Sequence, residues 1–146
     1  MSRVRAALRA HRRLPALLLF LGLLPARTSA DVVAIVAPNS AILTLSKSQV
    51  ADLFLGKARR FPDGSVALPV DQADGRSVRD EFYAKVADRS PAQIRAYWSK
   101  IIFTGRGQPP VTVPNSADMK KRIAQNPYAI GYIEANLVDA SVRVVF

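Results

Sequence analysis

The sequence predicts an α/β domain in which a mixed sheet is flanked by helices. Short apolar runs rich in β-branched residues, which are typical of buried strands, alternate with segments whose apolar residues recur at helical spacing. Several of the helical segments also begin with residues that cap helices. No repeat, low-complexity tract or linker interrupts this pattern, so we expect one domain.

The first thirty residues have a different character. Residues 1–13 hold five arginines and no acid, eleven uncharged residues follow from Leu14 to Leu24, and "PARTSA" ends in small residues. This pattern is typical of a secretory signal peptide. A membrane anchor is the alternative, but the apolar run is shorter than the roughly 20 residues that a span needs. We expect cleavage after Ala30, which leaves residues 31–146 as a periplasmic domain without a stable membrane span.

Cleavage would change the charge of the protein. The whole chain has a formal net charge of +10, from 21 basic and 11 acidic residues. Six basic residues and no acidic ones lie in 1–30, so the remainder carries 15 basic and 11 acidic residues, a net charge of +4. A mildly basic surface of this kind does not indicate nucleic-acid binding.

The predicted mature domain lacks two residue types that dominate catalysis and metal binding. The chain has no cysteine, and its one histidine, His11, lies in the predicted signal peptide. Cys–His dyads, Ser-His-Asp triads and ordinary zinc sites are therefore excluded. We expect a non-enzyme with no catalytic residues, metal or cofactor. The remaining enzyme hypothesis is acid–base chemistry by Asp71 and Asp74, although turn chemistry accounts for Asp74 and the sequence shows no partner for Asp71.

The mature domain begins with a strand and a helix. "VVAIVA", residues 32–37, predicts a buried strand that stops at the turn cluster of residues 38–40. "SKSQVADLFLG", residues 46–56, predicts a helix, because Ser46 and Gln49 have the spacing of a capping box and a glycine ends the segment.

A second strand and helix follow. "VALPV", residues 66–70, predicts a strand in which Pro69 indicates an edge or an irregular end. The next segment predicts a helix, because Val78, Phe82 and Val86 are spaced four apart.

"SPAQIRAYWSKIIF", residues 90–103, has the strongest helical pattern in the chain. Ser90 and Gln93 have capping-box spacing, and Pro91 stands at the first helical position. We expect this helix to be the central packing element, with one apolar face made of Ile94, Tyr97, Trp98, Ile101 and Ile102.

The last part of the chain predicts three short strands and one helix. "VTV", residues 111–113, precedes a helix for which we expect Ser116 to be the cap. "AIGYI" and "VRVVF" then close the chain as two more strands.

A polar turn follows the second predicted strand. "VDQADGRSVRDEFY" places an Asp74-Gly75 turn before a helix start that carries Arg76 and Ser77. The free N–H groups and the dipole at a helix start favour an anion. The alternative is an ordinary turn in which Ser77 caps the helix and the acidic residues of the first turn complement the dipole.

A second polar loop follows the first predicted strand and contains Asn39 and Ser40. Ligands of open α/β sheets bind beyond the carboxyl ends of the strands. If strands 32–37 and 66–70 are parallel neighbours, this loop and residues 71–77 lie at the same edge and form a joint site. A plain loop is the alternative for each of them.

Four sequence blocks resemble the phosphate-binding proteins of ABC transporters, and most closely the short, single-lobe members of that periplasmic binding-protein superfamily. The resemblance covers roughly 32–145 and implies one α/β lobe, export to the periplasm, and an anion held by loop amides and hydroxyls at helix starts. The blocks are "LSKSQVADLFLGK", "ALPVDQADGRSVRDEFY", "YWSKIIFTGRGQPP" and "NPYAIGYIE".

The chain departs from this family at the anion-binding turn. The two-lobed transporters have a Ser-Gly-Thr turn with an upstream arginine. Alignment of the turns puts Arg76, Ser77 and Val78 at the Ser-Gly-Thr positions and Gln72 at the arginine position. The candidate ligand-binding residues are Asn39, Ser40, Gln72, Gly75, Arg76 and Ser77.

The leading hypothesis is an exported solute-binding domain for phosphate or a similar small oxyanion. It includes a link to ABC-type phosphate uptake, with a membrane permease or another periplasmic protein as the partner. The alternative is a non-transport interaction or structural domain whose ligand site has decayed.

Overall fold

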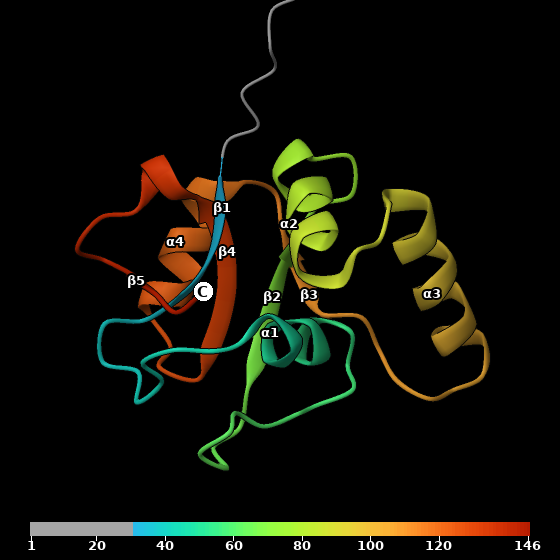
Figure 1. Cartoon of the computed structure of the whole chain (residues 1–146), viewed down its shortest axis with the longest axis horizontal. Helices are drawn as coiled ribbons and strands as arrows, with labels where there is room; N and C mark the ends of the chain where they lie inside the picture. Colours follow the sequence, from blue (N-terminus) through green and yellow to red (C-terminus); the bar gives the residue numbers. More distant parts are fainter. Residues whose placement is uncertain (1–30) are drawn as a thin grey trace, which may run out of the picture.

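The computed structural model describes residues 31–146 (Figure 1), and the predicted signal peptide lies outside this range. The described chain forms a five-stranded mixed sheet with helices packed on it, so the predicted fold class is confirmed. The elements are β1 (Val32–Val36), α1 (Lys47–Phe54), β2 (Leu68–Gln72), α2 (Ser77–Ala87), α3 (Pro91–Phe103), β3 (Val111–Val113), α4 (Ser116–Ala124), β4 (Ala129–Glu134), the 3₁₀ turn η1 (Ala135–Leu137) and β5 (Arg143–Val144).

The order of the strands is β3-β2-β4-β1-β5. β2 runs parallel to β3 and β4, whereas β1 runs antiparallel to β4 and β5. The first two strands are therefore not parallel neighbours, since β4 lies between them and β1 runs opposite to β2, and the condition for a joint site of the two polar loops is not met. The physical reason is that the late segment "AIGYI" is apolar and buried along its length, so it takes a central position between the two earlier strands.

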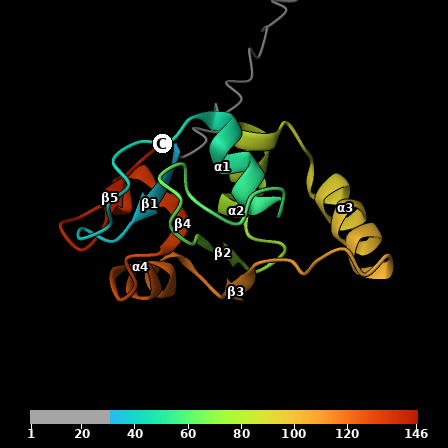
Figure 2. The ribbon, with the colours of Figure 1, turned by 90° about the horizontal axis from the view of Figure 1, so that it is seen from below.

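Helices cover both faces of the sheet. Figure 2 shows α1 and α2 on one face and α4 on the other. Successive residues of β1 face opposite ways, so Ala34 and Val36 pack with α1 and α2, while Val33 and Ile35 pack with α4. The centre of the larger core is an aromatic group in which Phe82 stacks on Tyr132 at 3.9 Å between ring centroids.

Side chains cap three of the four α-helices within residues 31–146. Ser46 and Ser90 form the two predicted capping boxes at α1 and α3. The cap of α4 is Asn115, whose side chain accepts a hydrogen bond from the N–H of Asp118 at 2.8 Å. The prediction of Ser116 as this cap is wrong because Ser116 is already the first helical residue.

Helix α3 is peripheral, and the prediction that it is the central packing element is wrong. Figure 1 shows it at the side of the molecule, next to α2. Trp98 is buried as expected, but Ile102 is 51% exposed and Phe103 is 92% exposed. The helix is amphipathic as predicted, but only part of its apolar face packs against the rest of the domain, and the side chains near its carboxyl end stay exposed.

No helix within residues 31–146 has both the length and the apolar composition that a membrane span requires.

Candidate functional site

The polar turn lies at the carboxyl end of β2, where residues 73–76 connect the strand to α2. Gly75 has φ +85°, a conformation that glycine adopts without strain, and its N–H donates to Asp74 Oδ1 at 3.0 Å. The N–H of Arg76 donates to the carbonyl of Ala73 at 3.3 Å, which closes the turn. Residues 74–77 are all exposed, so the turn is open to a ligand.

The start of α2 differs from the other helix starts. Its N-cap residue is Arg76, whose carbonyl accepts from the N–H groups of Arg79 and Asp80, and no described side chain caps the helix. Ser77 is the first helical residue, so the alternative in which Ser77 is the cap is wrong. Within the described chain no hydrogen bond satisfies the N–H groups of Ser77 and Val78. These two donors and the Ser77 hydroxyl remain available at the positive end of the helix dipole.

A buried polar cluster surrounds Asp71, near the end of β2 that leads into the turn. Asp71 is 2% exposed, and its carboxylate accepts hydrogen bonds from the hydroxyls of Tyr83, at 2.7 Å, and Tyr132. Arg79 Nε lies 3.4 Å from the same carboxylate. Burial and the nearby Asp71 charge raise the pKa of both tyrosines, so both hydroxyls stay protonated and donate. No local pattern in the sequence indicates these partners, because both tyrosines are far from Asp71 along the chain.

The charges of the cluster are balanced. Burial acts to lower the pKa of Arg79, but the negative charges of Asp71 and Asp74 outweigh burial, so its pKa is raised and the guanidinium stays charged. Asp74 Oδ1 lies 3.2 Å from Arg79 Nη1 and 3.5 Å from Arg95 Nη1. Two guanidinium groups therefore offset the negative charge of Asp74 at the turn.

This arrangement gives Asp71 and Asp74 structural roles. Asp71 is buried, and its carboxylate accepts from Arg79 and from the two tyrosine hydroxyls. Asp74 holds the turn and pairs with two arginines. The geometry offers no acid–base pair at this position.

The side chain of Gln72 does not reach the turn. Neighbouring strand residues face opposite sides of the sheet, so Asp71 points to the α2 side and Gln72 to the α4 side. Gln72 is fully buried, and its Nε2 donates to Ser116 Oγ at 2.9 Å and to the Tyr132 carbonyl at 3.2 Å. The structure thus separates the side chain of Gln72, which the resemblance aligned with an upstream arginine, from Gly75, Arg76 and Ser77.

Asn39 and Ser40 lie at the opposite end of the sheet from Gly75, Arg76 and Ser77. Because β1 and β2 run in opposite directions, their carboxyl ends point to opposite edges. The Ser40 hydroxyl accepts from the N–H of Ile42 at 3.2 Å, and its carbonyl accepts from Arg143 at 2.8 Å. The two loops therefore do not converge as they would beside parallel neighbouring strands, and of the candidate residues Gly75, Arg76 and Ser77 are those that lie together at the polar turn.

Among known proteins, the chain matches solved structures but no family model and no curated sequence. Among solved structures, a protein from Clostridium perfringens assigned as a phosphate ABC transporter substrate-binding protein, with phosphate bound, has a TM-score of 0.63 and 23% identity over 78% of this chain and 43% of its own.

Two further solved structures agree with this match. An ABC-type phosphate transport receptor from Vibrio cholerae has a TM-score of 0.58 and 17% identity, over 78% of this chain and 44% of its own. PstS from Borrelia burgdorferi has a TM-score of 0.55 and 12% identity, over 78% of this chain and 46% of its own. The chain thus spans less than half the length of these neighbours, and it has the α/β fold of one lobe-sized part of phosphate ABC transporter substrate-binding proteins.

Proposed function

We propose that residues 31–146 form an exported, non-catalytic domain that binds phosphate or a similar small oxyanion at residues 75–77. The observation that carries the proposal is the start of α2, which is exposed and uncapped among the described residues, in a fold shared with proteins described as binding phosphate. A membrane permease or another periplasmic protein is the partner that this function implies.

The oxyanion would be held mainly by backbone groups. The N–H groups of Ser77 and Val78 and the Ser77 hydroxyl can donate to it, and the dipole of α2 favours its charge. The guanidinium of Arg76 is exposed and has no ion pair or side-chain hydrogen bond within residues 31–146, so it can add charge-assisted contacts.

Two features limit the affinity. Asp80 adds a negative charge in the first turn of α2. A single lobe also leaves one side of the anion in water, where each electrostatic contact is weaker than in a closed cleft. We expect phosphate to bind the monomer with a Kd no tighter than about 100 µM, which corresponds to roughly −5.5 kcal/mol.

Calorimetry on phosphate-free protein tests this proposal, with sulfate as a competitor. The double variant Arg76→Ala/Ser77→Ala should weaken phosphate binding at least about fivefold, because it removes one charged and one neutral donor. The matched control is Ser99→Ala/Lys100→Ala, an adjacent exposed pair on α3, which should leave the Kd unchanged.

Two results would contradict the proposal. Micromolar or tighter binding would show that the open turn is a stronger site than the single-lobe argument allows. Absence of binding would favour the alternative, an interaction or structural domain with a decayed site. This alternative is supported by the burial of Gln72, the residue that the resemblance aligned with the upstream arginine of the family turn.

Export is tested by intact-mass measurement of the protein made in a Gram-negative host. The proposal predicts a mature amino terminus at Asp31, because the "ARTSA" exit follows an eleven-residue uncharged run. Recovery of protein that keeps residues 1–30 would contradict the periplasmic assignment in favour of an anchored form.

A further inference from the structure

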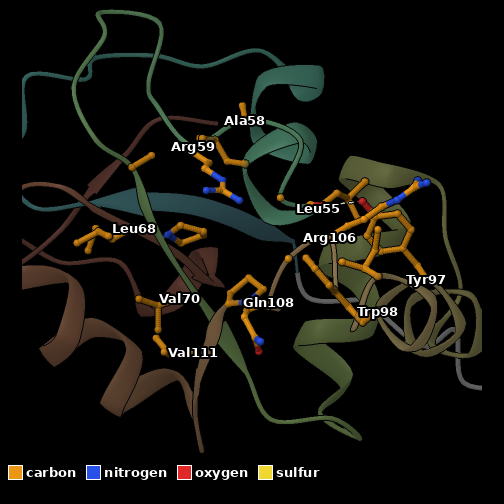
Figure 3. Close-up of a pocket in the computed structure, with 18 of the residues that line it drawn as sticks. Leu55, Ala58, Arg59, Leu68, Val70, Tyr97, Trp98, Arg106, Gln108 and Val111 are labelled. Atoms are coloured by element: carbon orange, nitrogen blue, oxygen red, sulfur yellow. Dashed lines mark hydrogen bonds between the residues drawn. The ribbon is translucent and has the colours of Figure 1, made fainter. Parts of the chain in front are cut away.

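A pocket lies at the end of β2 that is remote from the polar turn. Its volume is about 580 Å³, and it lies between α1, α3 and the first residues of β2 and β3 (Figure 3). Sites for small organic ligands typically measure about 300–1,000 Å³. Leu68–Val70 line this pocket, whereas the candidate oxyanion turn follows the other end of the same strand.

The walls of the pocket are apolar and aromatic. Figure 3 shows Tyr97 and Trp98 on one side and Leu68, Val70 and Val111 on the other. Leu68 and Val111 are 45% and 58% exposed and line the same pocket, and exposed apolar side chains that gather in a groove can mark a ligand-binding site. An apolar ligand body in the pocket would cover both.

Two contacts hold the aromatic wall in place. The hydroxyl of Tyr97 donates to the carbonyl of Leu55 at 2.6 Å. Gly56, with φ +70°, lets the Trp98 ring approach closely, since a Cβ at this position would lie 3.2 Å from the ring. The wall is therefore formed by the packing of α3 against the end of α1.

Positive charge is concentrated at this pocket. Arg59, Arg106 and Arg122 line it, and no Asp or Glu does. In the described part of the chain, the guanidinium groups of these arginines form no ion pair and no hydrogen bond. Trp98 also lines the pocket, and its buried Nε1 has no partner among residues 31–146. A buried donor of this kind is costly to leave unpaired.

We propose that this pocket binds an amphipathic organic carboxylate, with the apolar body against Trp98 and Leu68 and the carboxylate paired with Arg59 and Arg106. The apolar walls favour a ligand with an apolar body over a bare inorganic ion such as phosphate, because a strongly hydrated anion gains nothing from Leu68, Val70 and Val111 and loses water beside them. The three unpaired guanidinium groups favour an anionic head over a neutral or cationic one. The proposal is independent of oxyanion binding at the turn.

Trp98 provides a direct reporter, since it is the one tryptophan in the chain and lines the pocket. The protein is titrated with decanoate, 1-decanol and decyltrimethylammonium, all below their micelle or solubility limits, with tryptophan fluorescence and calorimetry as readouts. Decanoate should saturate and bind at least about tenfold more tightly than decanol, because charge-assisted contacts are stronger than neutral ones. The cationic probe should not bind.

The double variant Arg59→Gln/Arg106→Gln isolates the charge. It should weaken decanoate binding about tenfold and leave decanol binding unchanged, since only the charged head loses its partners. Lys100→Gln, which removes a positive charge from α3 outside the pocket, is the matched control and should change neither. Circular dichroism verifies that each variant is folded.

Three outcomes would overturn the proposal. One is a decanoate titration in which neither fluorescence nor heat saturates up to about 1 mM, a concentration that corresponds to roughly −4.1 kcal/mol. Another is equally tight binding of decanol and decanoate. The third is an arginine variant that binds decanoate like the unmodified protein.

Discussion

The two ends of β2 offer different surfaces. At its carboxyl end, the chain passes through the exposed turn of residues 73–76 into α2, and the available donors are backbone N–H groups and the side chains of Arg76 and Ser77. At its amino end, Leu68–Val70 line an apolar pocket whose polar groups are arginine and tryptophan side chains. One end is suited to a small hydrated anion, the other to an anion with an apolar body.

The difference follows from the direction of the helices. The positive end of the α2 dipole lies at the polar turn, so backbone groups favour an anion there. The pocket instead lies at the carboxyl end of α1, where the dipole disfavours an anion, and the Leu55 carbonyl is already occupied by Tyr97. Positive charge at the pocket must therefore come from side chains, and the arginines supply it.

Substitution of Asp71 should have the largest effect on the free energy of unfolding. Asp71→Asn removes the charge that faces the buried Arg79, and loss of one partner from a buried ion pair costs about 3–5 kcal/mol. Urea denaturation measures it. The control is Asp52→Asn, whose side chain has no hydrogen bond or ion pair within the described residues, and which should change stability by no more than about 0.5 kcal/mol. Equal effects of the two variants would show that the polar cluster does not support the turn.

At the other end of β2, Trp98→Ala should destabilise the protein by about 3 kcal/mol, the lower end of the range for a buried aromatic residue. The lower end applies because α3 is peripheral and the ring borders an open pocket. Thermal denaturation followed by far-UV circular dichroism measures the change. A melting temperature within error of the unmodified protein would show that the aromatic wall is not packed as described.

The turn itself should be sensitive to backbone change. Gly75→Ala forces a side chain into a left-handed conformation and should cost about 1–2 kcal/mol, although no atom lies within 4 Å of the new Cβ. Gly107→Ala at the pocket is the comparison: its Cβ would make an ordinary 3.5 Å contact with Ile101, and its stability should change by no more than about 0.5 kcal/mol. A neutral Gly75→Ala would show that the turn has another conformation.

The smallest changes in the free energy of unfolding are expected for two serines at helix starts, and the two should differ. Ser90→Ala removes a capping box and should cost about 1 kcal/mol, whereas Ser77→Ala should cost no more than about 0.3 kcal/mol because Ser77 caps nothing. Chemical denaturation of the two variants in parallel measures the difference. Similar losses would indicate that the Ser77 hydroxyl is occupied within the protein and not free for a ligand.

Local signals in the sequence predicted local structure well. The capping boxes at Ser46 and Ser90, the alternation of strands and helices, and the Asp74-Gly75 turn are each determined by residues within a few positions, and the structure contains all of them. The resemblance to phosphate-binding proteins also predicted the fold that the solved structures share.

Features that depend on distant residues were not predicted. The position of β4 between β1 and β2 depends on which apolar strands pair with each other. The sequence therefore did not show that Asn39 lies at the opposite end of the sheet from Gly75. The partners of Asp71 are hydroxyls 12 and 61 positions away. The pocket forms because α3 packs against the end of α1, and the spacing of apolar residues along the chain does not predict which helices pack together.

The central claim is that phosphate binds at the polar turn and leaves the rest of the lobe unaffected. The direct test is a phosphate titration of ¹⁵N-labelled residues 31–146 followed by amide chemical shifts. We expect saturable shifts at Gly75, Arg76 and Ser77, with a Kd of about 100 µM or weaker, and no shifts at Asn39 or Trp98. Unchanged amides at the turn, or larger shifts at Asn39 or around the Trp98 pocket, would contradict it.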